Sequence, residues 1–151
     1  MDVGYKNEQG KFSLRAAALI INDNRLLLVK NDKCECYYTV GGGIQQNESS
    51  NSAVLRECYE ETGCHFEIDR LIFVQERFYK IAGACYHEIV LFYLMKEMNI
   101  KLQSGANTDQ KDEHLHWIPI EELDSVNVVP AFLKEAVKCI PNEVTHIISY
   151  E

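Results

Sequence analysis

Residues 42–64 read GGIQQNESSNSAVLRECYEETGC, a glycine-rich turn followed by a segment with helical periodicity. Ser49 suits the N-cap of a helix that ends near Thr62, and Gly63 suits the left-handed position that follows a helix. At about 100° per residue, an arc of roughly 100° on this helix carries three glutamates: Glu57, Glu60 and Glu61. Because like charges on one helix face repel each other, this crowding favours a bound divalent cation.

Taken alone, these glutamates have two interpretations, a metal site or the solvated acidic face that most glutamate-rich helices present. The longer spacing favours the metal site. The segment resembles the Nudix box of the Nudix hydrolases, in which Gly is followed after five residues by Glu, and after seven more by Arg-Glu-apolar-x-Glu-Glu-x-Gly-apolar. Its positions are filled in register by Gly42, Glu48, Arg56, Glu57, Cys58, Glu60, Glu61, Gly63 and Cys64. The resemblance implies an α/β fold for residues 1–151 as a single domain, an α/β/α sandwich with a mixed β-sheet between helices.

The resemblance also implies a role for each matching residue. Three side chains correspond to the metal-binding glutamates of the family: Glu57, Glu60 and Glu61. The backbone carbonyl of Gly41 is a further candidate ligand, and the expected ion is Mg²⁺ or Mn²⁺, which prefer oxygen ligands. Arg56 is expected to orient the glutamates through an ion pair with Glu60 rather than to contact the substrate. Asn47 replaces a glycine common in the family and also tolerates left-handed backbone.

The residue that acts as general base is left open by the sequence. Within the box the candidates are Glu57 and Glu60, and outside it the candidate is Glu113, which precedes Trp117 by four residues. Glu76 and Glu88, on predicted strands, are weaker alternatives. We therefore expect the catalytic groups to be found among Glu57, Glu60, Arg56 and Glu113.

Aromatic residues provide candidate contacts to a nucleobase, because their rings can stack on it. Tyr79, Phe78 and Tyr38 are the candidate substrate-binding residues. Aromatic side chains on strands more often fill a core, and this alternative stays open. The polar segment Met98 to Asp112 lacks periodicity, which is typical either of a flap beside a substrate or of a surface loop.

The flanking chain predicts strands separated by turns, with further helices near the C-terminus. Asn22-Asp23-Asn24 is a good turn, and Gly41-Gly42-Gly43 permits close backbone approach. A short helix follows Pro119, and Pro130–Ile140 is predicted to form an amphipathic helix. The predicted strands are Leu14–Ile21, Arg25–Lys30, Tyr37–Val40, Leu71–Tyr79, His87–Lys96, Leu115–Ile118 and, as a strand or a loose tail, Thr145–Tyr150.

Composition excludes several classes of partner. The chain has 151 residues with 23 acidic and 15 basic side chains, so a formal charge of −8 argues against broad binding to nucleic acids or anionic membranes. The longest apolar runs, Ala16–Ile21 and Ile89–Met95, are too short to span a bilayer. A polar turn rather than a cleavage site follows the first run, which argues against a signal peptide.

The six cysteines lack the spacing of a disulfide scaffold or a zinc site. We expect reduced thiols and a cytoplasmic location, with Cys34 and Cys36 as ordinary loop cysteines.

These expectations combine into one predicted activity, the hydrolysis of a diphosphate bond in a nucleoside diphosphate derivative by metal-activated water. A nucleoside triphosphate is the first choice of substrate, and a dinucleoside polyphosphate or a nucleotide sugar is the second. The alternative is a non-catalytic Nudix-like domain that binds a nucleotide or regulates another protein. The presence of all four box glutamates favours the enzyme. A homodimer is common among relatives, but no residue of this chain establishes one.

Overall fold

The computed structural model describes residues 1–102, 108 and 112–151, so most of the Met98 to Asp112 segment, expected to be either a flap or a surface loop, lies outside the described residues. The helical segments are α1 (Ser50–Thr62), the 3₁₀ helix η1 (Ile120–Ser125) and α2 (Leu133–Ala136). The strands are β1 (Gly4–Asn7), β2 (Gly10–Leu19), β3 (Ile21–Asn22), β4 (Arg25–Asn31), β5 (Tyr37–Gly43), β6 (Ile68–Ile81), β7 (Ala84–Met95), β8 (Glu113–Pro119), β9 (Val128–Val129) and β10 (Thr145–Tyr150).

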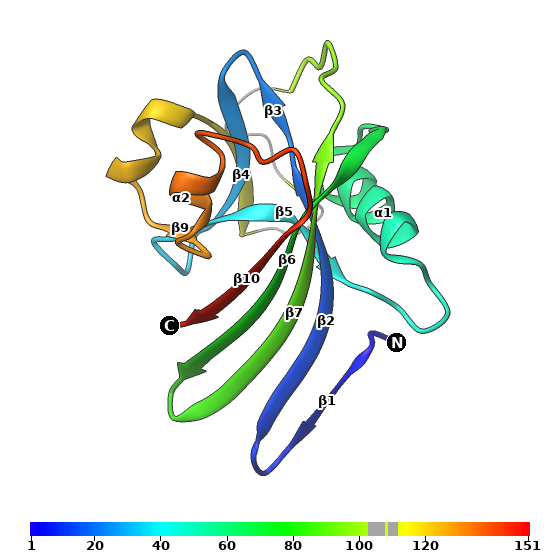
Figure 1. The fold of residues 1–151 in the computed structure, drawn as a ribbon, viewed down its shortest axis with the longest axis vertical. Helices are drawn as coiled ribbons and strands as arrows, with labels where there is room; N and C mark the ends of the chain where they lie inside the picture. Colours follow the sequence, from blue (N-terminus) through cyan, green and yellow to red (C-terminus); the bar gives the residue numbers. More distant parts are fainter. Residues whose placement is uncertain (103–107, 109–111) are drawn as a thin grey trace.

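The strands form a mixed sheet in the order β10-β6-β7-β2-β5-β4-β3, with β1, β8 and β9 paired to β2, β4 and β5 (Figure 1). The hairpin of β6 and β7 is antiparallel, whereas β2 runs parallel to β7 and β10 runs parallel to β6. The long strands β2, β6 and β7 extend beyond the helices toward the β1 edge. Each predicted strand has a counterpart, but the predicted Leu14–Ile21 strand is interrupted at Ile20 and divided between β2 and β3. The uncertain Thr145–Tyr150 segment is a strand with those same ends.

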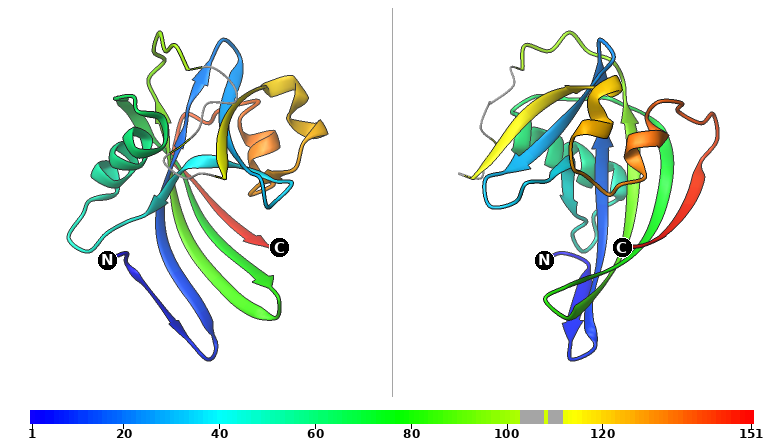
Figure 2. Two further views of the ribbon diagram at one scale, coloured as in Figure 1. Left: turned by 180° about the vertical axis from the view of Figure 1, so that it is seen from behind. Right: turned by 90° about the vertical axis from the view of Figure 1, so that its left-hand side faces the viewer.

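Helices cover the two faces of the sheet (Figure 2). Because successive strand residues point to opposite faces, β2 contributes Ala16 and Ala18 to the core beneath α1, and Ala17 and Leu19 to the core beneath η1 and α2. Burial on both faces explains why the middle of β2 is apolar without alternation. The predicted mixed sheet between helices is therefore confirmed.

The helix that carries the glutamates begins and ends where the sequence predicts. The Ser49 hydroxyl accepts a hydrogen bond from the Ser52 N–H at 3.1 Å, as an N-cap does. At the other end Gly63 has φ 71°, and its N–H donates to the carbonyl of Tyr59 at 2.8 Å. Asn47 adopts φ 65°, which agrees with its expected tolerance of left-handed backbone.

The predicted amphipathic helix over Pro130–Ile140 is wrong in length, because α2 contains only four residues. Its apolar side is correct, since Leu133 and Val137 are buried in the core beneath η1 and α2. The flanking turns close with hydrogen bonds between residues three apart, such as Lys134 N–H to the Ala131 carbonyl at 3.2 Å. This tighter winding does not extend an α-helix.

The expectation of six reduced cysteines is wrong for one pair. Cys34 and Cys36 form a disulfide in the turn between β4 and β5, while Cys58, Cys64, Cys85 and Cys139 are free. The turn brings the two Cα atoms to 5.3 Å, within the range that a disulfide can bridge. Spacing in the sequence does not reveal this geometry, because it depends on how the chain turns between two paired strands.

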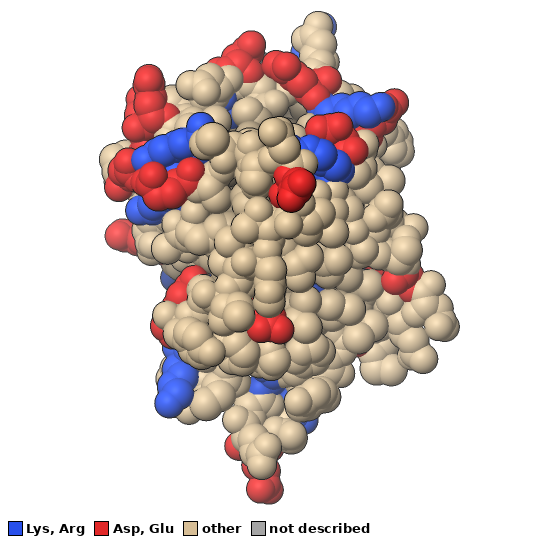
Figure 3. Space-filling view, in the orientation of Figure 1, with Lys and Arg blue, Asp and Glu red and all other residues tan. Residues whose placement is uncertain are grey.

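Charged side chains of both signs are interspersed on the face of the molecule shown in Figure 3, and they gather mainly at its upper end. Lysine and arginine do not form one large basic patch on this face, which agrees with the negative net charge. Among the described residues, no helix has the length and apolar character needed to cross a membrane.

Candidate active site

Arg56 of α1 connects the two ends of the motif. Its Nε and Nη2 donate to the two carboxylate oxygens of Glu48 at 2.8 and 3.0 Å. Its Nη1 donates to Glu57 at 2.6 Å and to Glu60 at 3.1 Å, so the predicted ion pair with Glu60 is present. Nη2 also donates to the Gly43 carbonyl at 3.0 Å. One guanidinium thus holds the glycine-rich end of β5 against the helix. The hydrogen bonds from Arg56 also lower the pKa of Glu48 below its ordinary value.

The glycines at the end of β5, Gly41–Gly43, let the Glu57 carboxylate lie directly against the backbone. A side chain at Gly42 would collide with that carboxylate, and one at Gly41, where φ is +148°, would collide with the Ala16 carbonyl of β2. Burial raises the pKa of Glu57, while Arg56 opposes the rise. The glycines of the strand therefore make room for a partly buried carboxylate.

The acidic groups line one hollow of about 410 Å³ between α1 and β5. Glu61 is 8% exposed, and Glu60 lies at the open side with a side chain that is 44% exposed. The hollow is lined by Arg15, Tyr38, Gly41, Gly42, Gly43, Gln45, Arg56, Glu57, Glu60, Glu61 and Glu113. It therefore brings together the three predicted metal glutamates, Gly41 and the base candidate Glu113.

The donor chemistry of this hollow suits a hard divalent cation, because carboxylate and carbonyl oxygens surround it. Arg56 Nη1 engages one oxygen each of Glu57 and Glu60, which leaves the second oxygen of each carboxylate for a ligand. Within residues 1–102, 108 and 112–151, no three acidic, histidine or cysteine side chains converge as a finished metal site. The residues present fit a metal by their chemistry and by the space that Gly42 leaves for Glu57.

Glu113 reaches the hollow through strand pairing, because β8 pairs with β4 and β4 pairs with β5. Its side chain is buried, with Tyr38 Oη donating to its Oε1 at 2.5 Å and Asn31 Nδ2 donating at 3.4 Å. Burial and the hydrogen bond to Glu113 raise the pKa of the Tyr38 hydroxyl well above its ordinary value. Tyr38 therefore remains a proton donor to Glu113 at neutral pH.

A second cavity, of about 350 Å³, continues from the hollow across the sheet face opposite α1. The two spaces share four residues: Arg15, Tyr38, Gly41 and Glu113. Arg15 and Gln75 are cavity residues that sequence reasoning missed. The available signal is a polar residue next to a short apolar run, Arg15 before Ala16–Leu19 and Gln75 after Leu71–Val74, in strands that also carry other polar residues.

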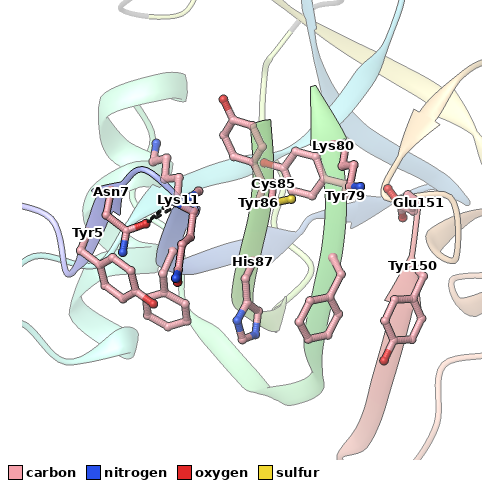
Figure 4. A pocket seen from close by; sticks show the side chains of 14 residues that line it. Tyr5, Asn7, Lys11, Tyr79, Lys80, Cys85, Tyr86, His87, Tyr150 and Glu151 are labelled. Carbon is pink, nitrogen blue, oxygen red and sulfur yellow. Dashed lines mark hydrogen bonds between the residues drawn. The ribbon is translucent and has the colours of Figure 1, made fainter. Parts of the chain in front are cut away.

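Only one of the two predicted aromatic contacts on β6 lines the 350 Å³ cavity, because adjacent strand residues point to opposite faces. That residue is Tyr79, which also lines the hollow of about 510 Å³ shown in Figure 4, where it lies beside Tyr86 at a ring distance of 4.8 Å. Phe78 stacks on His87 and Tyr150, at 4.3 and 5.1 Å, and lines the 510 Å³ hollow but not the 350 Å³ cavity.

Comparison with known proteins adds a match over most of the chain. The family model described as NUDIX domain matches residues 11–139. Among curated proteins, the 8-oxo-dGDP phosphatase NUDT18 of Danio rerio is 28% identical over 127 residues, covering 78% of this chain and 37% of that protein. This chain thus spans little more than a third of the curated relative.

Solved structures resemble the fold at low sequence identity. The mMutator MutT protein from Bacillus halodurans aligns with a TM-score of 0.68 and 14% identity, covering 91% of this chain and 89% of that one. The E. coli ORF135 protein aligns with a TM-score of 0.62 and 24% identity, covering 84% and 89%. These likenesses establish the architecture, while activity has to be argued from the site.

Proposed function

Because this chain belongs to the NUDIX domain family and is a Nudix hydrolase, we propose that it cleaves a diphosphate bond in a nucleotide with the help of Mg²⁺ or Mn²⁺. The observation that carries the proposal is the shared hollow in which Glu57, Glu60 and Glu61 meet Glu113. A phosphoanhydride carries negative oxygens that repel a nucleophile, so carboxylates alone would oppose the reaction. The α1 glutamates and the Gly41 carbonyl would hold a divalent ion, which would supply the neutralising charge and lower the pKa of a bound water.

The side chains have distinct proposed roles in moving the proton and holding the geometry. Glu57 has a pKa raised by burial, which favours its acting as a proton acceptor. Glu113 is the second candidate base, and the Tyr38 hydroxyl fixes one of its oxygens at 2.5 Å. Arg56 positions the carboxylates of Glu57 and Glu60 by donating to both from one nitrogen.

We propose a nucleoside triphosphate as the first substrate class to test. The name of the Danio rerio relative adds an oxidised nucleoside diphosphate, 8-oxo-dGDP, to the candidates. Nucleotide sugars and dinucleoside polyphosphates are the remaining classes.

The test is chromatographic detection of the nucleotide products formed from these four classes with Mg²⁺, with Mn²⁺ and with EDTA. Glu61→Gln removes one proposed ligand charge while conserving shape, and Glu67→Gln is the matched control because Glu67 is an exposed glutamate paired with Lys96. We expect metal-dependent turnover that Glu61→Gln lowers by several orders of magnitude and Glu67→Gln preserves. Near-normal turnover in a folded Glu61→Gln protein would overturn the metal assignment. Nucleotide binding without any turnover would instead support a non-catalytic domain.

A further inference from the structure

Several polar side chains that line the 350 Å³ cavity have no role in the proposed chemistry. Arg77 and Glu88 form an ion pair with each other at 3.6 Å, whereas Arg15 of β2 and Gln75 of β6 each keep a polar group without a partner among the described residues. Both pair in register with the same residue, because Val90 of β7 lies opposite Arg15 on one side and Gln75 on the other. All three line the cavity, so they form a row on one face of the sheet. With neighbouring strands about 4.8 Å apart, the two polar residues lie roughly 10 Å apart along this row.

Only one of the two polar atoms of the Gln75 side-chain amide forms a hydrogen bond with a described residue. Its side chain has 0% exposure, and its Nε2 donates to the Ser149 hydroxyl of β10 at 2.9 Å. Its Oε1 is buried without a hydrogen-bond partner among the residues that the structure describes. A buried amide oxygen without a partner costs free energy, so a cavity that retains one is suited to a ligand that supplies the missing donor.

Arg15 places a positive charge where the cavity meets the carboxylate hollow, since it lines both. Among the described residues its guanidinium forms no hydrogen bond or ion pair, in contrast to Arg56 and Arg77. Its charge acts at a distance on Glu57 and on Tyr79. A guanidinium that is free of partners and lies beside acidic groups is suited to an anionic ligand such as a phosphate.

We infer that the row Arg15–Val90–Gln75 recognises a nucleotide, with Arg15 binding a phosphate oxygen and Gln75 Oε1 accepting a hydrogen bond from an N–H on the base edge. The inference rests on the proposed function, since it orients the phosphates toward the α1 glutamates and the base away from them.

Calorimetric binding in EDTA tests the row without requiring turnover. The probes are GMP against guanosine, which differ in the phosphate, and two pairs that differ by one exocyclic amino group: GMP against IMP, and AMP against purine riboside monophosphate. We expect the unaltered chain to bind GMP more tightly than guanosine. Within one of the two amino pairs, we expect the dissociation constants to differ by roughly fivefold to a hundredfold. Equal binding in both amino pairs would overturn the role of Gln75, whatever any variant does.

The variants assign each preference to its residue. Arg15→Met should remove the preference for nucleotide over nucleoside, and Gln75→Met should remove the preference for the amino group while retaining that for phosphate. Gln9→Met and Arg25→Met are matched controls, because Gln9 and Arg25 are exposed and lie outside this cavity. A Gln75→Met protein that keeps the amino preference would refute the inference. Because the assay contains no metal, absent hydrolysis would count against the proposed function and not against this row.

Discussion

Replacing Arg56 by methionine should destabilise the protein by about 3 kcal/mol when no divalent metal is present. The Arg56 side chain is 24% exposed, and its partners Glu48 and Glu57 are 15% and 14% exposed. Breaking a buried ion pair by removing one partner costs about 3–5 kcal/mol, because the remaining charge stays desolvated. The residual exposure places the estimate at the lower end of that range, and the more exposed Glu60 adds little.

Thermal unfolding followed by circular dichroism in EDTA measures this effect. For a domain of this size, about 3 kcal/mol corresponds to a fall in Tm of roughly 6–12 °C. Arg56→Lys retains the charge but loses the planar fork that reaches Glu48 and Gly43 together, so an intermediate fall is expected. Lys96→Met is the control, because its ion pair with Glu67 at 2.8 Å is exposed to solvent and should contribute little to stability.

The predicted loss of stability arises from the burial of the partner carboxylates. A fall in Tm for Arg56→Met that is no larger than the fall for Lys96→Met would therefore refute this explanation. An unchanged Tm in Arg56→Lys would show that charge alone, rather than the arrangement of donors, stabilises the contact between α1 and β5.

Three other changes test separate parts of the structure. Gly42→Ala should lower turnover about 100-fold with the fold retained, because the added Cβ displaces the Glu57 carboxylate; steady-state kinetics beside a circular dichroism spectrum checks this. Ser49→Ala should cost about 1 kcal/mol in urea unfolding, since the hydroxyl caps α1, and an unchanged midpoint would contradict that role. Burial, followed by the nearby charges of Lys30 and His114, lowers the pKa of His116 in the folded state. Just below pH 6.5 the unfolded state therefore binds more protons than the folded state, and the free energy of unfolding decreases as the pH falls. His116→Gln should flatten this loss between pH 7.5 and 5.5, and an unaltered pH dependence of the urea midpoint would contradict it.

Local interactions explain which elements could be predicted from the sequence. The ends of α1 follow from Ser49 and Gly63, whose hydrogen bonds join residues at most four apart. The segment Pro130–Ile140 also has an apolar side, yet it forms only the short α2. Burial of Leu133 and Val137 satisfies that pattern without a long helix, so periodicity fixed the buried side but not the winding.

The candidate site divides in the same way. Glu57, Glu60 and Glu61 lie within five residues of one helix, so helical geometry alone places them together. Glu113 reaches the same hollow only because β8 pairs with β4 and β4 with β5. Phe78 and Tyr79 are neighbours in the sequence and both line the 510 Å³ hollow, but only Tyr79 reaches the cavity that adjoins the carboxylates.

The sequence by itself determined the family, the helix and the carboxylates, because these depend on spacings within 23 consecutive residues. Only the tertiary structure decided which residues face the carboxylates across the sheet. The row of Arg15, Val90 and Gln75 requires the register of three strands. The antiparallel register of β6 and β7 is set locally by their hairpin, but β2 pairs in parallel with β7 across a long stretch of chain. That second register depends on burial on both faces of the sheet and on hydrogen bonds between distant segments, so only the tertiary structure decides it.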